Sequence, residues 1–338
     1  MEIFQVGGSI RDELLGVIPN DRDWVVVGSS PKKMEEMGFK PIGKDFPVFL
    51  HPQTKEEYAL ARTEKKSGVG YKGFNFYCGE EVTIEDDLKR RDFTINAIAK
   101  NTAGDLIDPF GGAGDIKHKI FKHVSNAFSE DPLRALRLAR FKTYAHLQDF
   151  SVASSTLALL DIISHSKELA SLSADRIWME VQRALSNPYS QNFFYSLLEY
   201  SLQSPWFDSL KVVSCEESSP TLKWAELQRA NGFSLGANLP VPKSYTNAAE
   251  ALMKVLEIVD CSIVEEKLLL IEALNVPRNY DELMIMLSMN ILKDQKRYIE
   301  DILTKTNGID FQVLAQVDHL QVSERKHLLY YDALHKLL

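Results

Sequence analysis

Cysteines are scarce in this sequence, and their spacing suits neither a disulfide-stabilised fold nor a structural zinc site. The 338 residues contain only Cys78, Cys215 and Cys261, which are widely separated and odd in number. Disulfide-rich folds need paired cysteines, and zinc sites need closely spaced cysteines or histidines. We therefore expect a protein of a reducing compartment, the cytoplasm.

Long apolar runs are missing as well. The first five residues lack the basic region and the apolar core of a signal peptide. No later segment offers the roughly 20 apolar residues that a membrane-spanning helix needs. The hydrophobic fraction of 45% and the charged fraction of 25% are ordinary for a globular protein. The length allows two or three domains, and we expect no association with a membrane.

An excess of positive charge is also absent, because the formal net charge is −8. This balance excludes a protein that is basic over its whole surface. It does not exclude binding to nucleic acid, since a local basic face is enough to contact phosphates. Lys117, Lys119 and Lys122 form one basic stretch and are candidate contacts.

Two carboxylates stand at the start of a predicted strand. Asp21 and Asp23 are separated by one residue and are followed by the apolar run 24–27. In a strand, side chains two residues apart point the same way, and like charges on one face repel unless a cation lies between them. Oxygen ligands favour Mg²⁺. The pair predicts a metal site, although solvated aspartates at a polar strand start would give the same pattern.

A glycine turn precedes this pair. Residues 3–6 predict a strand that ends at Gly7-Gly8, and residues 10–16 predict a helix. Glycine lets backbone N–H groups approach an anion, and Arg11 can add a guanidinium. With the carboxylates just downstream, the pattern favours a phosphate-binding turn over a simple tight turn.

Two charged segments follow further along the chain. Residues 63–74 contain three glycines and three lysines, which predicts a mobile basic loop, either a solvated hairpin or a lever beside the site. Residues 84–91 predict a helix that runs into Asp92. An arginine of the Arg90-Arg91 pair could hold a triphosphate, and Asp92 could orient it or accept a hydrogen bond from a ribose hydroxyl. A surface ion-pair cluster is the alternative.

A helix rich in arginine is predicted to begin near Ser129, which stands where an N-cap belongs, with Pro132 in the first turn. Charged residues recur at intervals of three and share one broad face. They are Asp131, Arg134, Arg137 and Arg140. A solvated helix would more usually alternate lysine and glutamate, so this face is interpreted as a grip for a planar anionic ligand. From about residue 150 onward, the spacing of apolar residues is helical.

Four motifs, in this order, resemble the bacterial CCA-adding enzymes, class II tRNA nucleotidyltransferases of the poly(A) polymerase-like superfamily. They occupy residues 7–12, 21–23, 90–97 and 130–141. The resemblance is close over residues 1–145 and weak beyond. It implies an α+β fold in which a nucleotidyltransferase head with a small mixed β-sheet (1–125) precedes a helical neck with the base-recognition helix (126–205) and a helical body and tail that bind tRNA (206–338).

The resemblance also implies a role for each motif residue. Asp21 and Asp23 would be the catalytic metal ligands, and Gly8 and Arg11 would contact the triphosphate. Arg91 would contact the nucleotide, and the segment 63–74 would be the lever that permits the switch from C to A addition. The remaining roles fall on the arginine-rich helix: Asp131 and Arg134 would read the base, with Arg137 and Arg140 holding phosphate or base beside them.

The implied function is template-independent addition and repair of the 3′-terminal CCA of tRNA from CTP and ATP, with tandem CCACCA addition to unstable tRNAs. The partner is the tRNA acceptor end, and no protein partner is expected. In a two-metal scheme with Mg²⁺, one ion on Asp21 and Asp23 would lower the pKa of the 3′-hydroxyl, and a second would hold the β- and γ-phosphates, so that attack on the α-phosphorus would release pyrophosphate. Glu57 or Glu130 could assist, although structural roles fit them as well.

The chemistry of the bases agrees with these roles. Cytosine and adenine both offer an amino donor beside a ring-nitrogen acceptor. A carboxylate and a guanidinium one helical turn apart, as at Asp131 and Arg134, complement that pair. Guanine and uracil present a carbonyl and a ring N–H, which would leave both protein groups mismatched.

Three alternatives share parts of this pattern. A poly(A) polymerase has the same head motifs but usually a strongly basic C-terminal region, whereas residues 322–338 are mixed in charge. A CC-adding enzyme lacks the lever, and a non-catalytic RNA-binding module would not need the two aspartates. No adjacent His-Asp pair is present, so the shorter subgroup without a phosphohydrolase domain, and no phosphatase activity, is expected.

Overall fold

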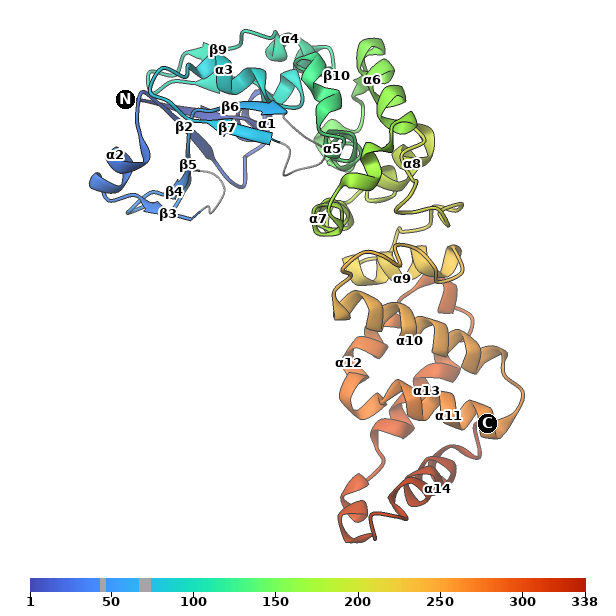
Figure 1. The fold of residues 1–338 in the computed structure, drawn as a ribbon. Helices are drawn as coiled ribbons and strands as arrows, with labels where there is room; N and C mark the ends of the chain where they lie inside the picture. The colour runs from blue at the N-terminus through green and yellow to red at the C-terminus, as the bar shows by residue number, and fades with distance from the viewer. Residues whose placement is uncertain (43–46, 67–73) are drawn as a thin grey trace. The chain divides into compact units, whose positions relative to one another are not determined.

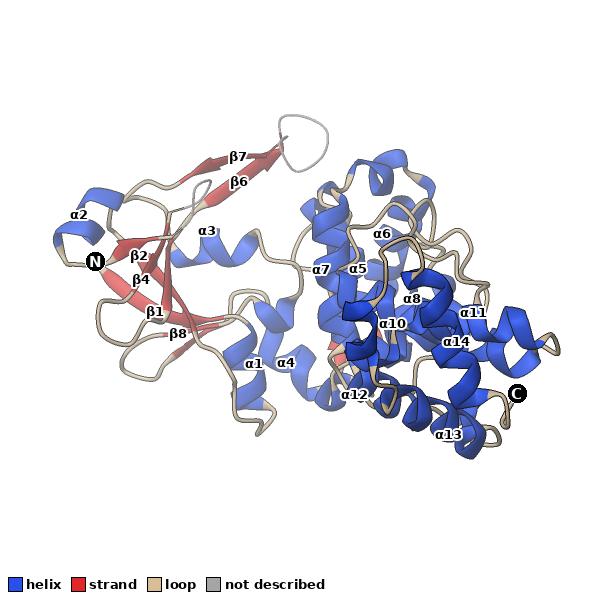
Figure 2. Cartoon of the chain, turned by 90° about the horizontal axis from the view of Figure 1, so that it is seen from below, coloured by secondary structure: helices blue, strands red, loops and turns tan. Residues whose placement is uncertain are grey.

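The computed structural model describes residues 1–42, 47–66 and 74–338. The chain forms two compact units, Met1–Asp208 and Ser209–Leu338 (Figure 1). The first unit combines a mixed sheet with helices. The described residues of the second unit form helices and loops (Figure 2). This arrangement confirms the predicted α+β class, with a sheet-containing head followed by helices.

The main sheet of the described residues has seven strands in the order β3-β4-β5-β2-β1-β8-β9. Strands β2 and β5 run parallel, and β1 pairs with β2 and β8 in antiparallel fashion. The strands are β1 (Glu2–Val6), β2 (Asp23–Val27), β3 (Lys40–Pro41), β4 (Val48–Leu50), β5 (Glu57–Leu60), β8 (Ala99–Lys100) and β9 (Leu106–Ile107).

Both faces of this sheet are covered. Alternate residues of β2 enter different apolar clusters, since Val25 packs with Leu88 and Val26 packs with Met34. A strand buried on both faces is read in the sequence as a continuous apolar run rather than as an alternating one. The apolar run 24–27 therefore indicates a central strand.

The register of β2 brings the site residues to one edge of the sheet. Val6, the last residue of β1, pairs with Asp23, the first residue of β2. Glu57, the first residue of β5, also pairs with Asp23. The glycine turn that follows β1 and the carboxylates that begin β2 are therefore neighbours.

The segment 63–74 is not a plain loop at its ends. Strands β6 (Thr63–Lys66) and β7 (Phe74–Tyr77) pair in antiparallel fashion, as a hairpin would require. The lever prediction falls mainly on residues 67–73, which lie outside the described residues.

The helices of the first unit surround the sheet and form a bundle after it (Figure 1). A short parallel pair is formed by β10 (Ile120–Phe121), which precedes α5 in the sequence, and β11 (Ser151–Val152), which follows it. The helices are α1 (Gly8–Leu14), α2 (Pro31–Glu36), α3 (Ile84–Lys89), α4 (Gly112–Lys117), α5 (Leu133–Phe141), α6 (Ser154–His165), α7 (Ala174–Leu185) and α8 (Gln191–Glu199).

The expected N-cap at Ser129 is wrong. Helix α5 begins at Leu133, and Ser129 lies in a preceding 3₁₀ turn, where its hydroxyl donates to Asn126 O. Pro132 restricts the residue before it to extended backbone, and Asp131 has φ −116° and ψ 98°. The helix therefore starts after Asp131, whose Oδ1 accepts a hydrogen bond from Leu133 N at 3.1 Å.

The second unit is built from helices around one apolar core, to which Leu252, Ile271 and Leu303 contribute. The helices are α9 (Pro220–Ala230), α10 (Lys243–Asp260), α11 (Val264–Leu274), α12 (Val276–Met286), α13 (Lys296–Asn307) and α14 (Val322–Leu334). In the described part of the chain, none of the helices is long and apolar enough to cross a membrane.

Two glycines of α4, a helix of the first unit, provide a matched test of how closely this helix approaches Thr94. A Cβ on Gly112 would lie 2.1 Å from Thr94 O, whereas a Cβ on Gly114 would meet nothing within 4 Å. We expect Gly112→Ala to lower the free energy of unfolding by about 1–3 kcal/mol, because backbone must move. Gly114→Ala should leave it unchanged or raise it by ~0.5–1 kcal/mol through helix propensity. Urea unfolding of both variants tests this, and equal stabilities would contradict the close approach of α4.

Candidate active site

Asp23 is the first residue of β2 and Asp21 lies two residues before it, and both side chains are accessible to solvent. The protein around Asp23 nevertheless desolvates its carboxylate, and this effect raises its pKa above the ordinary value. Arg91 and Arg137 act against this rise, and the charge of Asp21 adds to it. These mutual effects place two carboxylates and two guanidinium groups in one electrostatic neighbourhood.

Carboxylate ligands at this edge suit a hard cation. Mg²⁺ is commonly held by one or two carboxylates together with substrate phosphates, so Asp21 and Asp23 are a sufficient donor set. Within residues 1–42, 47–66 and 74–338, no group of three or more His, Cys, Asp or Glu side chains is arranged to hold a metal ion. Glu57 is exposed and in register with Asp23 on the neighbouring strand, which makes it a further acidic residue at this edge.

The glycine turn admits two arginines. Gly7 has a φ of +77°, which disfavours other residues, and a Cβ there would lie only 2.8 Å from Arg91 Nη1. A Cβ on Gly8 would lie 3.4 Å from Arg11 Nη2. Both guanidinium groups therefore lie against the turn, next to the carboxylates of β2. This places positive charge where a phosphate chain would need it.

Arg11 is held rigidly. Its guanidinium is buried, donates from Nη1 to Asn96 Oδ1 at 2.8 Å, and donates from Nε to Asp12 Oδ1 at 2.8 Å. Its Cζ atom also lies 5.4 Å from the centre of the Phe141 ring on α5. Asp12 Oδ1 also lies within hydrogen-bond distance of His146 Nε2, at 3.0 Å. These contacts fix the orientation of Arg11 before any ligand binds.

Asp92 binds Arg137 of α5, whereas the sequence suggested that it could orient one of the neighbouring arginines, Arg90 or Arg91. Arg137 Nε donates to Asp92 Oδ2 at 2.7 Å, and Asn96 Nδ2 donates to Asp92 Oδ1 at 3.1 Å. Burial alone would raise the pKa of Asp92, but Arg137 and these hydrogen bonds hold it well below the ordinary range. The carboxylate is therefore an ionised anchor for Arg137.

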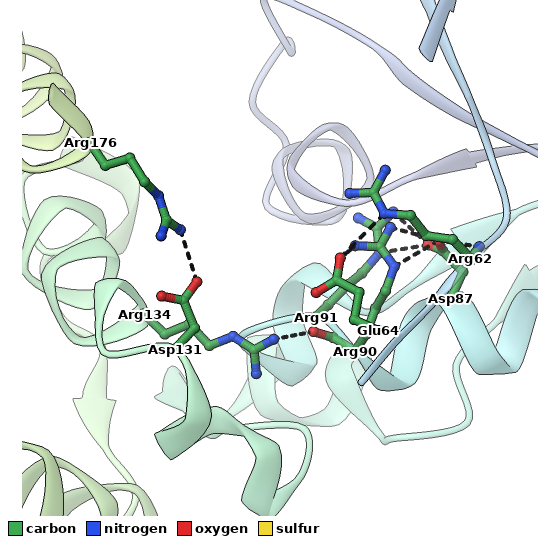
Figure 3. A network of polar contacts seen from close by, with 8 residues as sticks. All are labelled: Arg62, Glu64, Asp87, Arg90, Arg91, Asp131, Arg134 and Arg176. Carbon is green, nitrogen blue, oxygen red and sulfur yellow. Dashed lines mark hydrogen bonds and ion pairs between the residues drawn. The ribbon is translucent and has the colours of Figure 1, made fainter. Parts of the chain in front are cut away.

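Asp87 has a similar role for the neighbouring arginines, and sequence reasoning missed it. This α3 residue is fully buried and accepts from Arg90 Nη2 at 2.6 Å and from Arg91 Nη2 at 3.1 Å. Glu64 on β6 accepts from Arg90 Nη1 at 2.8 Å and from Arg62 Nε at 3.3 Å. Figure 3 shows these residues as one cluster. The spacing of Asp87 and Arg91, four residues apart on a predicted helix, was the available signal.

Asp131 and Arg134 each bind a different partner (Figure 3). Asp131 Oδ2 accepts from Arg176 Nη2 of α7 at 3.0 Å. Arg134 is buried, and it donates from Nη1 to Ala127 O at 3.0 Å and from Nη2 to Arg90 O at 2.5 Å. The structure thus brings the predicted base-reading pair next to the ion cluster that contains Arg90. It also shows that both side chains are already oriented.

Arg137 and Arg140 differ in accessibility. The Arg137 side chain is 34% exposed, whereas that of Arg140 is 5% exposed. Arg140 donates from Nε to Glu180 Oε2 at 2.5 Å and from Nη1 to Tyr144 OH at 2.6 Å. Arg140 therefore joins α5 to α7 in the interior, and Arg137 is the more accessible of the two. The sequence reasoning missed Glu180 and Arg176, for which no local pattern existed.

The charge of Asp87 makes a test of this cluster. Burial would raise its pKa, but Arg90 and Arg91 outweigh burial and lower it. A lowered pKa in the folded state stabilises the fold above the unfolded value of about 3.9, and the contribution is lost as the pH falls through the folded value. We expect Asp87→Asn to lower the free energy of unfolding by about 3 kcal/mol or more at pH 7.

Between pH 5 and pH 3, the free energy of unfolding of Asp87→Asn should also fall less than that of the wild type, because the carboxyl group that titrates has been removed. Urea unfolding at both pH values measures each effect. The exposed Asp86→Asn variant on the same helix is the control for charge, although it removes a contact to Thr83. An Asp87→Asn variant that matches the wild type at pH 7 would contradict the buried ion cluster.

The fold is similar to that of solved CCA-adding enzymes. The crystal structure of the Bacillus stearothermophilus CCA-adding enzyme in complex with CTP matches with a TM-score of 0.66 and 21% identity, over 99% of this chain and 89% of that chain. The Thermotoga maritima CCA-adding enzyme complexed with tRNA-CCA matches with a TM-score of 0.51 and 20% identity, over 99% and 77%. At these identities the likeness establishes the fold.

Sequence families agree with the fold. Residues 3–122 match the family described as "Poly A polymerase head domain", and residues 149–213 match the family described as "Probable RNA and SrmB- binding site of polymerase A". The chain therefore carries a poly(A) polymerase head domain and the RNA-binding region of that family, and its fold is the one found in CCA-adding enzymes.

Proposed function

We propose that this protein is a CCA-adding enzyme, which builds and repairs the 3′-terminal CCA of tRNA from CTP and ATP without a template. The observation that carries the proposal is the meeting of three features in the first unit. These are the carboxylates next to the start of β2, the arginines at the glycine turn, and the pair formed by Asp131, just before α5, and Arg134 in its first turn. The superfamily and the CTP and tRNA complexes of similar structures support it.

Asp21 and Asp23 are the proposed metal ligands and catalytic residues. Mg²⁺ bound there would supply Lewis-acid chemistry to the 3′-hydroxyl of tRNA and to the triphosphate. Burial raises the pKa of Asp23 and the charge of Asp21 adds to the rise, so a cation held between the two carboxylates would offset their repulsion. Glu57 is our candidate for an additional carboxylate, on the grounds of its register with Asp23.

The triphosphate is proposed to bind along the glycine turn. Gly8 lets the backbone approach a phosphate closely, and Arg11 and Arg91 place guanidinium groups against the same turn. Guanidinium groups match phosphate oxygens in two-point contacts. Because Asn96 and Asp87 already orient these arginines, little side-chain entropy is lost when the nucleotide binds.

The base is proposed to bind at the start of α5. Asp131 accepts a hydrogen bond from the amino group of cytosine or adenine, and Arg134 donates to the adjacent ring nitrogen. Arg137, which is accessible, contacts phosphate or base beside them. Arg140 contributes to the same site, and its buried contact with Glu180 favours a positioning role.

The rest of the chain is proposed to hold the tRNA. We assign residues 1–125 to the catalytic head, residues 126–205 to the neck and residues 206–338 to the body and tail that contact the acceptor arm. The protein would work in the cytoplasm, on the grounds of its few and widely separated cysteines.

Incubation with tRNA that lacks CCA tests the proposal directly. With CTP and ATP, the wild type should add three nucleotides and stop, and with ATP alone it should add no long tract. Asp21→Asn should reduce transfer by ~10³-fold or more, equivalent to about 4 kcal/mol, and should leave tRNA binding largely intact. The exposed Asp161→Asn variant of α6 is the control. Long A tracts from ATP alone would identify a poly(A) polymerase instead, and full activity of Asp21→Asn would refute the catalytic role.

A further inference from the structure

Helix α7 supplies one charged side chain to each end of α5. Arg176 Nη2 donates to Asp131 Oδ2 at 3.0 Å, and Glu180 Oε2 accepts from Arg140 Nε at 2.5 Å. Arg176 and Glu180 are one turn apart on α7, and their charges are opposite. The two ion pairs therefore define how α5 lies on α7, with Arg176 at the end where the base is proposed to bind. Figure 3 shows Arg176 reaching across to Asp131.

The carboxylate of Asp131 is held at both oxygens. Oδ1 accepts from Leu133 N at 3.1 Å, and Oδ2 accepts from Arg176 Nη2 at 3.0 Å. An ionised carboxylate has about four acceptor positions, so these two bonds leave room for a third donor. Its side chain is 20% exposed, which leaves it accessible to a ligand. The contacts fix the direction in which the free acceptor positions point.

We infer that Arg176 is a specificity-determining positioning residue, which orients the Asp131 carboxylate toward the amino group of an incoming cytosine or adenine. This inference rests on the proposed function. Arg176 does not itself need to touch the nucleotide. It acts through Asp131, whereas Arg134 is oriented separately by the carbonyl groups of Arg90 and Ala127.

The chemistry behind this role concerns the orientation of the carboxylate. A carboxylate can only accept, and it therefore pairs with an amino group and is mismatched with the carbonyl of uracil or guanine. The Arg176 guanidinium donates to Oδ2 and holds the carboxylate in a defined rotamer. Without this contact the carboxylate rotates away from the amino group, so the correct nucleotide gains less from it and the discrimination against the wrong nucleotide falls.

A purely structural role for Arg176 makes a different prediction. Loss of the contact between α5 and α7 would lower transfer of all four nucleotides by the same factor. The ratio of kcat/KM for two nucleotides, measured on one preparation, does not depend on the fraction of folded enzyme. It therefore separates a loss of selectivity from a loss of stability.

The experiment compares R176Q, R176K and R183Q. Arg183 lies on the same helix with an exposed side chain, so R183Q removes the same charge away from Asp131. The kcat/KM ratios are measured for CTP over UTP on tRNA lacking CCA, and for ATP over GTP on tRNA ending in CC. We expect R176Q to lower both ratios by about tenfold or more, which corresponds to ~1.4 kcal/mol. R176K should lie between R176Q and the wild type, since lysine is a point charge without the planar fork.

Each outcome either supports or overturns the inferred role of Arg176. Unchanged ratios in R176Q, or an equal fall in R183Q, would overturn the inference while the wild-type activity upholds the proposed function. If R176Q fails to fold, the ratios of R176K carry the test, and wild-type values would overturn the inference. A wild type that incorporates neither CMP nor AMP would refute the proposed function itself and the inference with it.

Discussion

The ion pair between Asp92 and Arg137 is the contact on which the arrangement of the site depends. Asp92 is buried, and it also accepts from Asn96, which in turn binds Arg11. This chain links the glycine turn to α5 through fixed hydrogen bonds. Buried ion pairs cost desolvation and are weak sources of stability, but removal of one partner leaves an uncompensated charge. Their value here is positional, because each buried carboxylate fixes an arginine that a nucleotide would contact.

The acidic residues of the site therefore fall into two groups, one buried and one accessible. Asp87 and Asp92 are buried and bind arginines of the protein itself, whereas Asp21 and Asp23 are accessible and lie where a cation and a substrate can reach them. We propose that the choice of nucleotide is made elsewhere, at the start of α5. On this proposal, transfer chemistry and base selection rest on different elements, and the Asp92–Arg137 pair belongs to the chain of contacts that links them.

Local sequence patterns were sufficient for much of this description. The strand, glycine turn and strand around Asp23 follow from neighbouring residues, and so does the helical spacing of Arg134, Arg137 and Arg140. The start of α5 was predicted three residues too early, because Pro132 excludes Asp131 from the helix and Ser129 belongs to a separate turn. The partners Arg176 and Glu180 could not be predicted, since they lie some 40 residues from α5 in the chain and meet it only through helix packing.

A double-mutant cycle of Asp92→Asn and Arg137→Gln tests the central claim most directly, with KM for CTP in the incorporation of CMP as the readout. If Asp92 acts by holding Arg137, each single substitution should raise KM, and Asp92→Asn should have little further effect once Arg137 is replaced. The coupling free energy should then lie at the upper part of the range of about 0.5–3 kcal/mol seen for residues in contact. Effects that simply add in the double variant would contradict the claim that the Asp92–Arg137 pair positions the nucleotide site.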